Sequence, residues 1–269
     1  MAERLYNPEG SLLRKDQKEI LGVLDFLAGI CKEHDIQWWL SSGTLLGAAR
    51  HKGYIPWDDD IDVVLLREDY KRLEKILSNL DSEEYFFQSM KTDVEYINVF
   101  SKLRKKSGHV EARDRRNKFY KYTGVGLDIF AIEKTNLFSA YVAKLLYHNI
   151  QYPTSYITVS WIRRPLVRLV EFLHFCLVFP LLRLIGKINP NGEYHYVQGT
   201  GWPRHKFYMK HTFPLSEAEF EGRMMPVPHD MDSYLTIVYG DWHRLPSEEE
   251  ILKAIHCREY REEIFGKDS

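Results

Sequence analysis

Residues 41–65, SSGTLLGAARHKGYIPWDDDIDVVL, contain the clearest structural pattern in the chain. A Ser-Gly-Thr turn leads into the helix-forming letters LLGAAR, and a loop with Gly53 and Pro56 then leads into an apolar stretch at residues 61–66. Residues 36–41, just before the turn, are bulky and apolar, as in a buried strand. The pattern predicts a strand, a turn, a short helix and a second strand that begins among aspartates.

Amphipathic helices are predicted on both sides of this segment. Residues 12–34 and 68–80 each place apolar side chains three and four positions apart, which is the spacing of one helix face. Strand-like stretches follow at residues 85–89, 96–103 and 126–132, separated by polar links. This order of elements predicts an α/β (α+β) fold around a mixed sheet.

Composition limits the class of protein. The 269 residues are 44% hydrophobic, and we predict a single domain over residues 1–269 with a helical insertion at about 136–198 and a loop-rich C-terminal part. Lys and Arg total 37 against 38 Asp and Glu, so overall charge does not indicate nucleic acid as a partner. Three widely spaced cysteines fit neither a disulfide framework nor a zinc knuckle, and the N-terminus lacks a signal-peptide pattern. We therefore expect a reducing, cytoplasmic location.

Four carboxylates lie within five positions at the start of the second predicted strand. Such crowding destabilises a fold by repulsion unless a cation or basic groups neutralise it. On a strand, Asp60 and Asp62 point to the same side about 6.5–7 Å apart, close enough to bind one Mg2+ or Mn2+ ion. Asp58 and Asp59 are expected to orient the loop or to hydrogen-bond behind the ligands. The alternative is a solvated acidic turn without metal.

Asp128 supplies a further carboxylate, within the apolar stretch GLDIF at residues 126–130. A buried aspartate without a partner is costly, so its position favours a role beside Asp60 and Asp62. The alternative is a capped or salt-bridged strand end. The turn at Gly43 and Thr44 opens a helix, where free backbone amides favour a phosphate, although an ordinary helix N-cap has the same pattern.

These stretches, with TFPLSEAEFEGRMMPVPHDMDSYLTIVYGDW at residues 212–242, resemble the LicD family of phosphocholine transferases, whose relatives include fukutin and the fukutin-related protein. The resemblance covers roughly residues 17–260. It implies a nucleotidyltransferase-like core in which Asp60, Asp62 and Asp128 are the metal carboxylates and catalytic residues. It also implies that Gly43 and Thr44 hold the nucleotide phosphates.

The resemblance implies an activity as well. Such enzymes transfer phosphocholine from CDP-choline to a sugar hydroxyl of teichoic acid or lipopolysaccharide and release CMP, and Asp128 would help to remove the acceptor proton. Another CDP-alcohol, such as an activated ribitol phosphate, is the alternative donor, and a non-catalytic glycan-assembly protein is a third interpretation. Acceptors in this family are often lipid-linked, which would make contact with the inner face of the plasma membrane useful.

Other side chains are candidates for substrate binding. Arg50, Lys102 and Arg104 lie beside the motif or on the next predicted strand and could hold phosphate oxygens, although each is also typical of a surface charge. Trp57 could hold a quaternary ammonium group over its ring, and His256 could contact acceptor or phosphate. A packed core ring and a surface histidine are the alternatives.

Residues 165–188, PLVRLVEFLHFCLVFPLLRLIGKI, are the most apolar part of the chain. Charged residues interrupt the run and Pro180 should kink it, so its uninterrupted part is expected to be too short to span a bilayer. Basic residues surround it, which favours an interfacial helix on an anionic membrane, while a buried helical hairpin is equally consistent.

Overall fold

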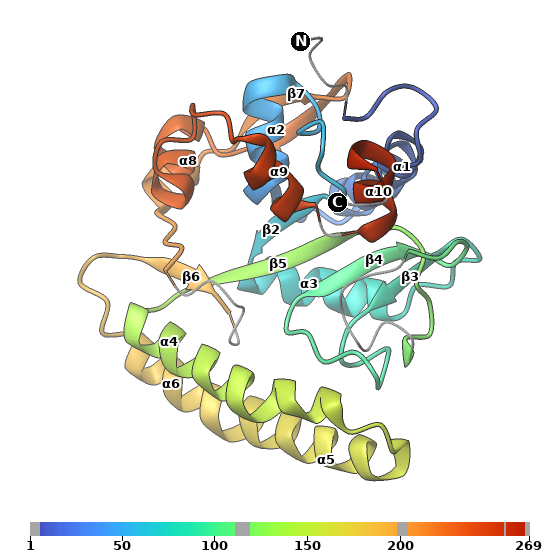
Figure 1. Ribbon diagram of the computed structural model, residues 1–269. Helices are drawn as coiled ribbons and strands as arrows, with labels where there is room; N and C mark the ends of the chain where they lie inside the picture. The colour runs from blue at the N-terminus through green and yellow to red at the C-terminus, as the bar shows by residue number, and fades with distance from the viewer. Residues whose placement is uncertain (1–5, 111–118, 198–203, 256, 267–269) are drawn as a thin grey trace.

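The computed structural model describes residues 6–110, 119–197, 204–255 and 257–266. In these parts of the chain a mixed sheet of six strands has the order β1-β2-β5-β4-β3, with β6 paired to β5 (Figure 1). Only β2 and β5 pair in parallel, and the other described pairs are antiparallel. The predicted α/β class with a mixed sheet is therefore confirmed. The strands are β1 (Trp39–Leu40), β2 (Asp62–Leu66), β3 (Tyr85–Gln88), β4 (Ser101–Lys105), β5 (Gly126–Lys134) and β6 (Tyr194–Tyr196).

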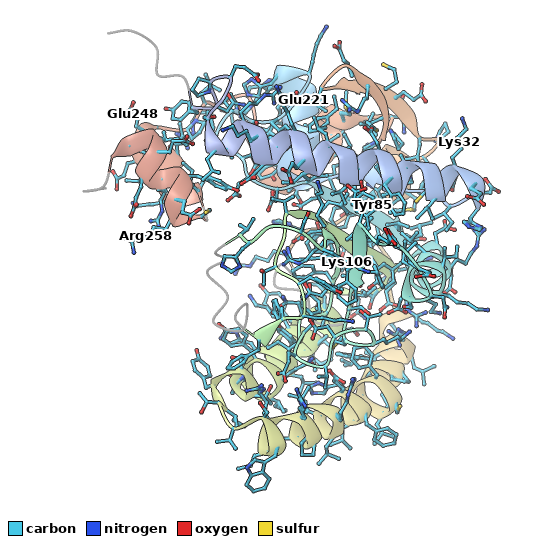
Figure 2. The ribbon with its side chains drawn as sticks, turned by 90° about the vertical axis from the view of Figure 1, so that its right-hand side faces the viewer. Lys32, Tyr85, Lys106, Glu221, Glu248 and Arg258 are labelled. Atoms are coloured by element: carbon cyan, nitrogen blue, oxygen red, sulfur yellow. The ribbon has the colours of Figure 1, made fainter. Side chains whose placement is uncertain are left out.

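The predicted amphipathic helices pack on this sheet. Helix α1 (Leu12–Glu33) contacts β4 and β5, and α3 (Arg67–Ser78) contacts β2 and β5. In Figure 2, α1 crosses the molecule toward Lys32 at its C-terminal end. Val63 and Val64, which point to opposite faces of the sheet, are both fully buried, as expected for a central strand with both faces covered. Both predicted helices therefore lie within two residues of their observed bounds.

Two predicted strands are shorter or shifted. The stretch 36–41 contributes only Trp39–Leu40 to the sheet, and α2 (Ser42–His51) follows directly. The stretch 96–103 becomes a strand only at Ser101, because the chain before it forms turns in which Asp93 accepts hydrogen bonds from Gln88 and from its own loop. Apolar content alone did not separate these turns from the strand.

The C-terminal part is more regular than the predicted loops. Its short elements are α7 (Met209–Thr212), the hairpin β7 (Ser216–Phe220) and β8 (Arg223–Val227), α8 (Met231–Tyr239), α9 (Glu248–Ala254) and α10 (Arg258–Phe265). Local signals support them, such as the capping box in which Ser247 and Glu250 cap α9. Helices α9 and α10 return to the start of α1 (Figures 1 and 2), where Leu13 packs with Ile251.

The insertion between β5 and β6 is a helical hairpin along one side of the domain (Figure 1). Its first arm comprises α4 (Leu137–Leu146), the π-helix η2 (Tyr147–Gln151) and the 3-10 helix η3 (Tyr152–Tyr156). Its second arm runs through α5 (Ser160–Leu173), the π-helix η4 (His174–Val178) and α6 (Phe179–Gly186).

The second arm corrects one expectation. It is continuous over Ser160–Gly186, 27 residues, and by length and composition it could cross a membrane, so the expectation of a run too short to span is wrong. Pro180 does not end the helix. It lies directly after the π turn of η4, where the α-helical hydrogen-bond pattern is already interrupted.

Candidate active site

Asp62 and Asp128 lie side by side on neighbouring parallel strands. Asp62 opens β2 and pairs in register with Asp128 on β5, and Asp128 pairs in register with Lys102 on β4. Register partners point to the same face of a sheet, so these three side chains form a row across three strands. The Lys102 ammonium contacts the Asp128 carboxylate.

The loop before β2 brings further carboxylates to this row. Oxygen atoms of Asp58, Asp59 and Asp60 all lie within 4.8 Å of one another. The backbone of this loop is held by fully buried Gln17, whose side-chain amide donates to the Asp58 carbonyl at 2.8 Å. Asp58 and Asp59, which we expected behind the metal ligands, therefore lie as close to Asp60 as ligands would.

The carboxylates act on one another electrostatically. Burial away from solvent raises the pKa of Asp62 well above its usual range, and the negative charges of Asp60 and Asp128 add to this rise, although the residue is only half-buried. Loss of water and the charges of Asp60 and Asp59 do the same to the pKa of Asp58. The pKa of Asp59 rises to about 6, mainly through loss of water, and the charge of Lys102 opposes this rise. Carboxylates in such a setting favour either a proton or a cation.

Residues of these types could hold a divalent cation. Among the described residues, the carboxylates whose oxygens all lie within 4.8 Å of one another are those of Asp58, Asp59 and Asp60, which is not the predicted set of Asp60, Asp62 and Asp128. Asp58, Asp59, Asp60, Asp62 and Asp128 together form an aspartate cluster. Their side chains offer carboxylate oxygens, the ligands that Mg2+ and Mn2+ prefer. Among the described residues, Lys102 is the cationic side chain that directly contacts one of these aspartates, Asp128. Its one positive charge cannot balance the five carboxylates of the aspartate cluster. A cation at this position would oppose the rise in pKa that burial and, to a smaller extent, mutual repulsion cause.

The turn at Gly43 and Thr44 is joined to the carboxylates. A Cβ atom on Gly43 would lie 2.5 Å from Oδ2 of Asp58, so the absence of a side chain lets this carboxylate pack against the start of α2. The Thr44 hydroxyl accepts a 2.8 Å hydrogen bond from the Asp62 backbone N–H. The N-terminus of α2, where the first amides have no partner within the helix, therefore lies next to the first residue of β2.

Two predicted phosphate ligands make other contacts. Arg50, at the end of α2, donates to the Arg244 carbonyl at 3.0 Å, and its guanidinium lies 5.9 Å from the centre of the Trp242 ring. Arg104 is buried and donates to the Gln88 side chain at 2.7 Å and to the Gly124 carbonyl at 2.9 Å. Both arginines therefore support neighbouring segments in this structure, whereas Lys102 faces the carboxylates.

The proposed choline and acceptor contacts are less close to the cluster. Trp57 packs edge-on against Tyr6, with ring centres 5.1 Å apart, and against the group formed by Leu13 and the C-terminal helices. Its ring is thus part of a packed interface. His256 lies outside the described residues. Its neighbour Cys257 donates its backbone N–H to Asp59 at 3.3 Å, so the C-terminal segment reaches the aspartate loop.

Tyr239 is a neighbour of the cluster that the sequence did not single out as a site residue. It ends α8, and loss of water together with the charges of Asp62 and Asp58 raises its pKa, although 43% of the residue is exposed. The signal was present, because Tyr239 belongs to the YGDW stretch that carries the family resemblance. Periodicity could not show that α8 ends near β2.

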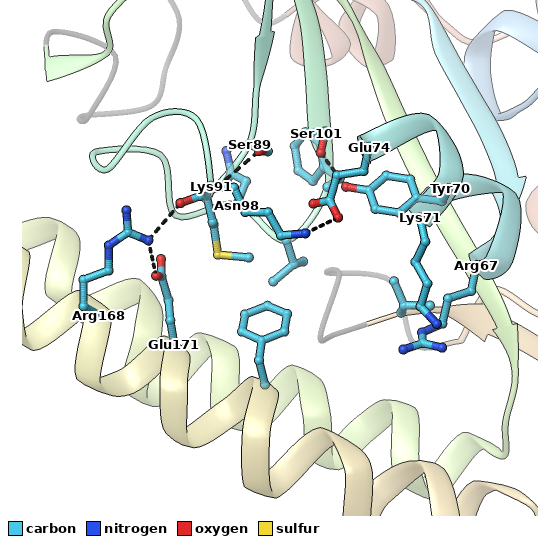
Figure 3. A pocket seen from close by; sticks show the side chains of 15 residues that line it. Arg67, Tyr70, Lys71, Glu74, Ser89, Lys91, Asn98, Ser101, Arg168 and Glu171 are labelled. Atoms are coloured by element: carbon cyan, nitrogen blue, oxygen red, sulfur yellow. Dashed lines mark hydrogen bonds and ion pairs between the residues drawn. The ribbon is translucent and has the colours of Figure 1, made fainter. Parts of the chain in front are cut away.

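A cavity of about 260 Å³ lies away from this cluster (Figure 3). It is bounded by α3, the chain before β4 and the second arm of the insertion, and its walls include Tyr70, Phe100 and Phe175. Basic side chains at its edge are paired with acids, as in the ion pair of Lys91 and Glu74. Its lining contains none of the aspartates described above.

Comparison with known proteins identifies relatives of this chain. Residues 35–170, just over half of the chain, match the family model described as LicD/FKTN/FKRP, nucleotidyltransferase domain. The chain is 28% identical to the lipopolysaccharide cholinephosphotransferase LicD of Haemophilus influenzae over 92% of this chain and 97% of that protein. It is 41% identical to the human ribitol 5-phosphate transferase FKRP, but over only 24% of this chain and 12% of that protein. It is also 38% identical to the mouse ribitol-5-phosphate transferase FKTN over 23% of this chain and 13% of that protein.

Proposed function

Because this chain belongs to the LicD/FKTN/FKRP nucleotidyltransferase-domain family, we propose that it transfers phosphocholine from CDP-choline to a sugar hydroxyl of a cell-surface glycan and releases CMP. The row of Asp62, Asp128 and Lys102 beside the aspartate loop is the observation that carries this proposal. The name of the Haemophilus relative, which aligns over most of both chains, supports choline and a lipopolysaccharide-type acceptor. A teichoic acid would offer the same hydroxyl chemistry, and either glycan could be lipid-linked at the cytoplasmic side of a membrane.

The residues can be given roles in this transfer. Asp60, Asp62 and Asp128 would hold Mg2+ or Mn2+, which when bound neutralises the diphosphate and stabilises the departing CMP. Backbone N–H groups at Gly43 and Thr44 would donate to a donor phosphate at the start of α2.

Lys102 and Asp128 would act at the transferred group. The Lys102 ammonium would leave the Asp128 carboxylate and bind a phosphate oxygen, because both partners are then satisfied by new opposite charges. An Asp128 oxygen would then be free to accept the proton of the acceptor hydroxyl. Positioning of donor and acceptor supplies most of the rate in such transfers.

The direct test measures CMP release by the purified protein with Mg2+, CDP-choline and a glycan acceptor. We expect release that depends on acceptor and metal and that is lost in Asp62→Ala. Absence of acceptor-dependent CMP release would overturn the choice of donor or acceptor. Full activity of Asp62→Ala would overturn the metal assignment.

A ribitol phosphate donor is the second candidate, because local similarity to FKRP and FKTN supports it. The same assay with CDP-ribitol in place of CDP-choline separates the two. A higher kcat/KM for CDP-ribitol would reverse the preference, since this ratio measures discrimination between competing substrates.

A further inference from the structure

The helical insertion holds most of the exposed apolar surface. Among the described residues, 21 large apolar side chains are largely exposed, and 17 of them lie between Leu137 and Ile188. They include Trp161 at 77% exposure, Phe172 at 58% and Leu181 at 61%. Scattered exposed apolar residues are normal on soluble proteins, but a concentration of this kind marks an interaction surface.

The second arm of the hairpin buries charged side chains and exposes many apolar ones. Arg163, only 1% exposed, binds Glu95 of the domain at 2.6 Å, and Arg183 binds Glu133 at 2.9 Å. Arg163 and Arg183 thus point toward the protein, although Arg164 and Arg168 stay partly exposed. Many of the exposed side chains of the arm are apolar, whereas the exposed face of a surface helix in a soluble domain is usually polar.

The arm lies flat along the domain. Arg163 holds its beginning and Arg183 its end, and 20 residues of helix place these two anchors about 30 Å apart. Asn136 also donates to the carbonyl oxygens of Ile185 and Ile188 at the same end. Figure 1 shows the hairpin lying along one side of the domain, and Figure 2 shows side chains projecting from its outer face. A helix held at both ends in this way presents its apolar face sideways and cannot cross a bilayer without leaving the domain.

The charge of the insertion selects the partner. Residues 137–188 contain six Lys or Arg residues and one acidic residue, Glu171. Glu171, together with Glu95 and Glu133 of the domain, pairs with four of the basic side chains, so six positive charges against three negative ones leave an excess of three. Arg164 and Arg168 keep about half of their side chains exposed, at 56% and 48%. A second copy of the same basic face would be repelled, whereas anionic lipid headgroups attract basic residues beside an apolar surface.

We propose that residues 137–188 dock the protein on an anionic membrane, with the outer face of the hairpin lying in one leaflet and no segment crossing it. The hairpin follows Lys134 at the end of β5, six residues and about 20 Å along the strand from Asp128. The aspartate cluster therefore stays on the aqueous side. This inference is independent of the proposed transfer reaction.

Vesicle binding by the full-length protein tests the proposal. In a co-sedimentation assay, vesicles of phosphatidylcholine mixed with phosphatidylglycerol should bind the protein about tenfold more tightly than phosphatidylcholine alone, and added salt should weaken this binding. Binding should also shift the fluorescence of exposed Trp161 to shorter wavelength. Trp161→Phe should still bind but lose most of that shift.

A matched pair of variants tests the surface itself. Phe172→Glu combined with Leu181→Glu should weaken binding to anionic vesicles about tenfold or more without unfolding the protein, because both side chains are largely exposed. Met224→Glu on β8, at 60% exposure, should bind as the wild type does.

Three outcomes would overturn the proposal. The first is that the protein binds neither kind of vesicle, and the second is that the double variant binds vesicles as tightly as the wild type. The third is that the wild type does not bind vesicles but self-associates, and that the double variant does not self-associate. The last outcome would assign the surface to a second copy of the chain. CMP release with a soluble acceptor should be unchanged in the double variant, so docking and transfer can fail separately.

Discussion

Asp62 and Asp128 are direct partners in the parallel pairing of β2 and β5, although they lie 66 positions apart in the sequence. The pairing forces two carboxylates together, and Lys102 on the next strand is the cation that meets them. Two neighbouring carboxylates with one ammonium group leave excess negative charge, and the aspartate loop adds more. The arrangement weakens the free protein at the place where a cation would strengthen it.

Replacing Asp62 with Asn should therefore separate stability from activity. In Asp62→Asn we expect the rate of CMP release to fall about 10³-fold, which corresponds to about 4 kcal/mol of lost transition-state stabilisation. In chelator, the melting temperature should rise by about 2–4 °C, because a repelled carboxylate is removed. Mg2+ should raise the melting temperature of the wild type but not of the variant.

Calorimetry and the CMP assay check this expectation, with the exposed Asp81→Asn as the control. The control should behave as the wild type does in both measurements. A lower melting temperature of Asp62→Asn in chelator would show that the Asp62 charge stabilises the free protein.

Gly43 gives a steric test of the α2 turn. In Gly43→Ala the new Cβ would meet Oδ2 of Asp58 at 2.5 Å, so the carboxylate must move and CMP release should fall about 10²-fold. Circular dichroism should show a folded protein. Gly22→Ala in α1 is the control, because its Cβ meets no atom within 4 Å, and it should raise the free energy of unfolding by about 0.5–1 kcal/mol.

The sequence predicted the elements that carry the first carboxylates because their signals are local. Apolar runs marked β2 and β5, and the spacing of Asp60 and Asp62 followed from the two-residue period of a strand. Asp128 was predicted to lie beside them from the cost of burying an unpaired carboxylate and from the family resemblance. Its register pairing with Asp62 is a contact between distant segments, which no short window of sequence shows.

The other residues at the site are brought together by packing between segments that lie far apart in the sequence. Nothing local shows that Cys257 donates to Asp59 or that Tyr239 ends beside the cluster. Arg104 has the same strand spacing as Lys102, but its guanidinium is occupied by Gln88. Spacing places a side chain on a face, whereas its partner is set by the packing of the whole domain.

The ion pair of Arg163 and Glu95 should be important for stability. Both residues are buried, and Glu95 also binds Arg164. Glu95→Gln leaves a buried guanidinium without its counter-charge and should lower the free energy of unfolding by about 3–5 kcal/mol. Urea denaturation measures this change.

An exposed ion pair serves as its control. Glu249 and Lys253 form an ion pair in which both side chains are more than 70% exposed. Glu249→Gln removes this ion pair and should change the free energy of unfolding by less than about 0.5 kcal/mol. Equal effects of the two substitutions would show that the insertion is not anchored through Glu95.

The N-cap of α8, the helix that ends at Tyr239, should make the stability of the protein sensitive to acid. Asp230 accepts hydrogen bonds from Ser233, which together with His211 lower its pKa to about 2. A carboxylate whose pKa is lower in the folded than in the unfolded protein stabilises the fold above pH 4, and this contribution disappears as the pH falls from about 4 to about 2. Asp230→Asn keeps an N-cap acceptor but cannot ionise. Urea denaturation at several pH values should show the wild type more stable than this variant at pH 6, with the difference shrinking toward pH 2, and a constant difference would exclude the Asp230 charge as its source.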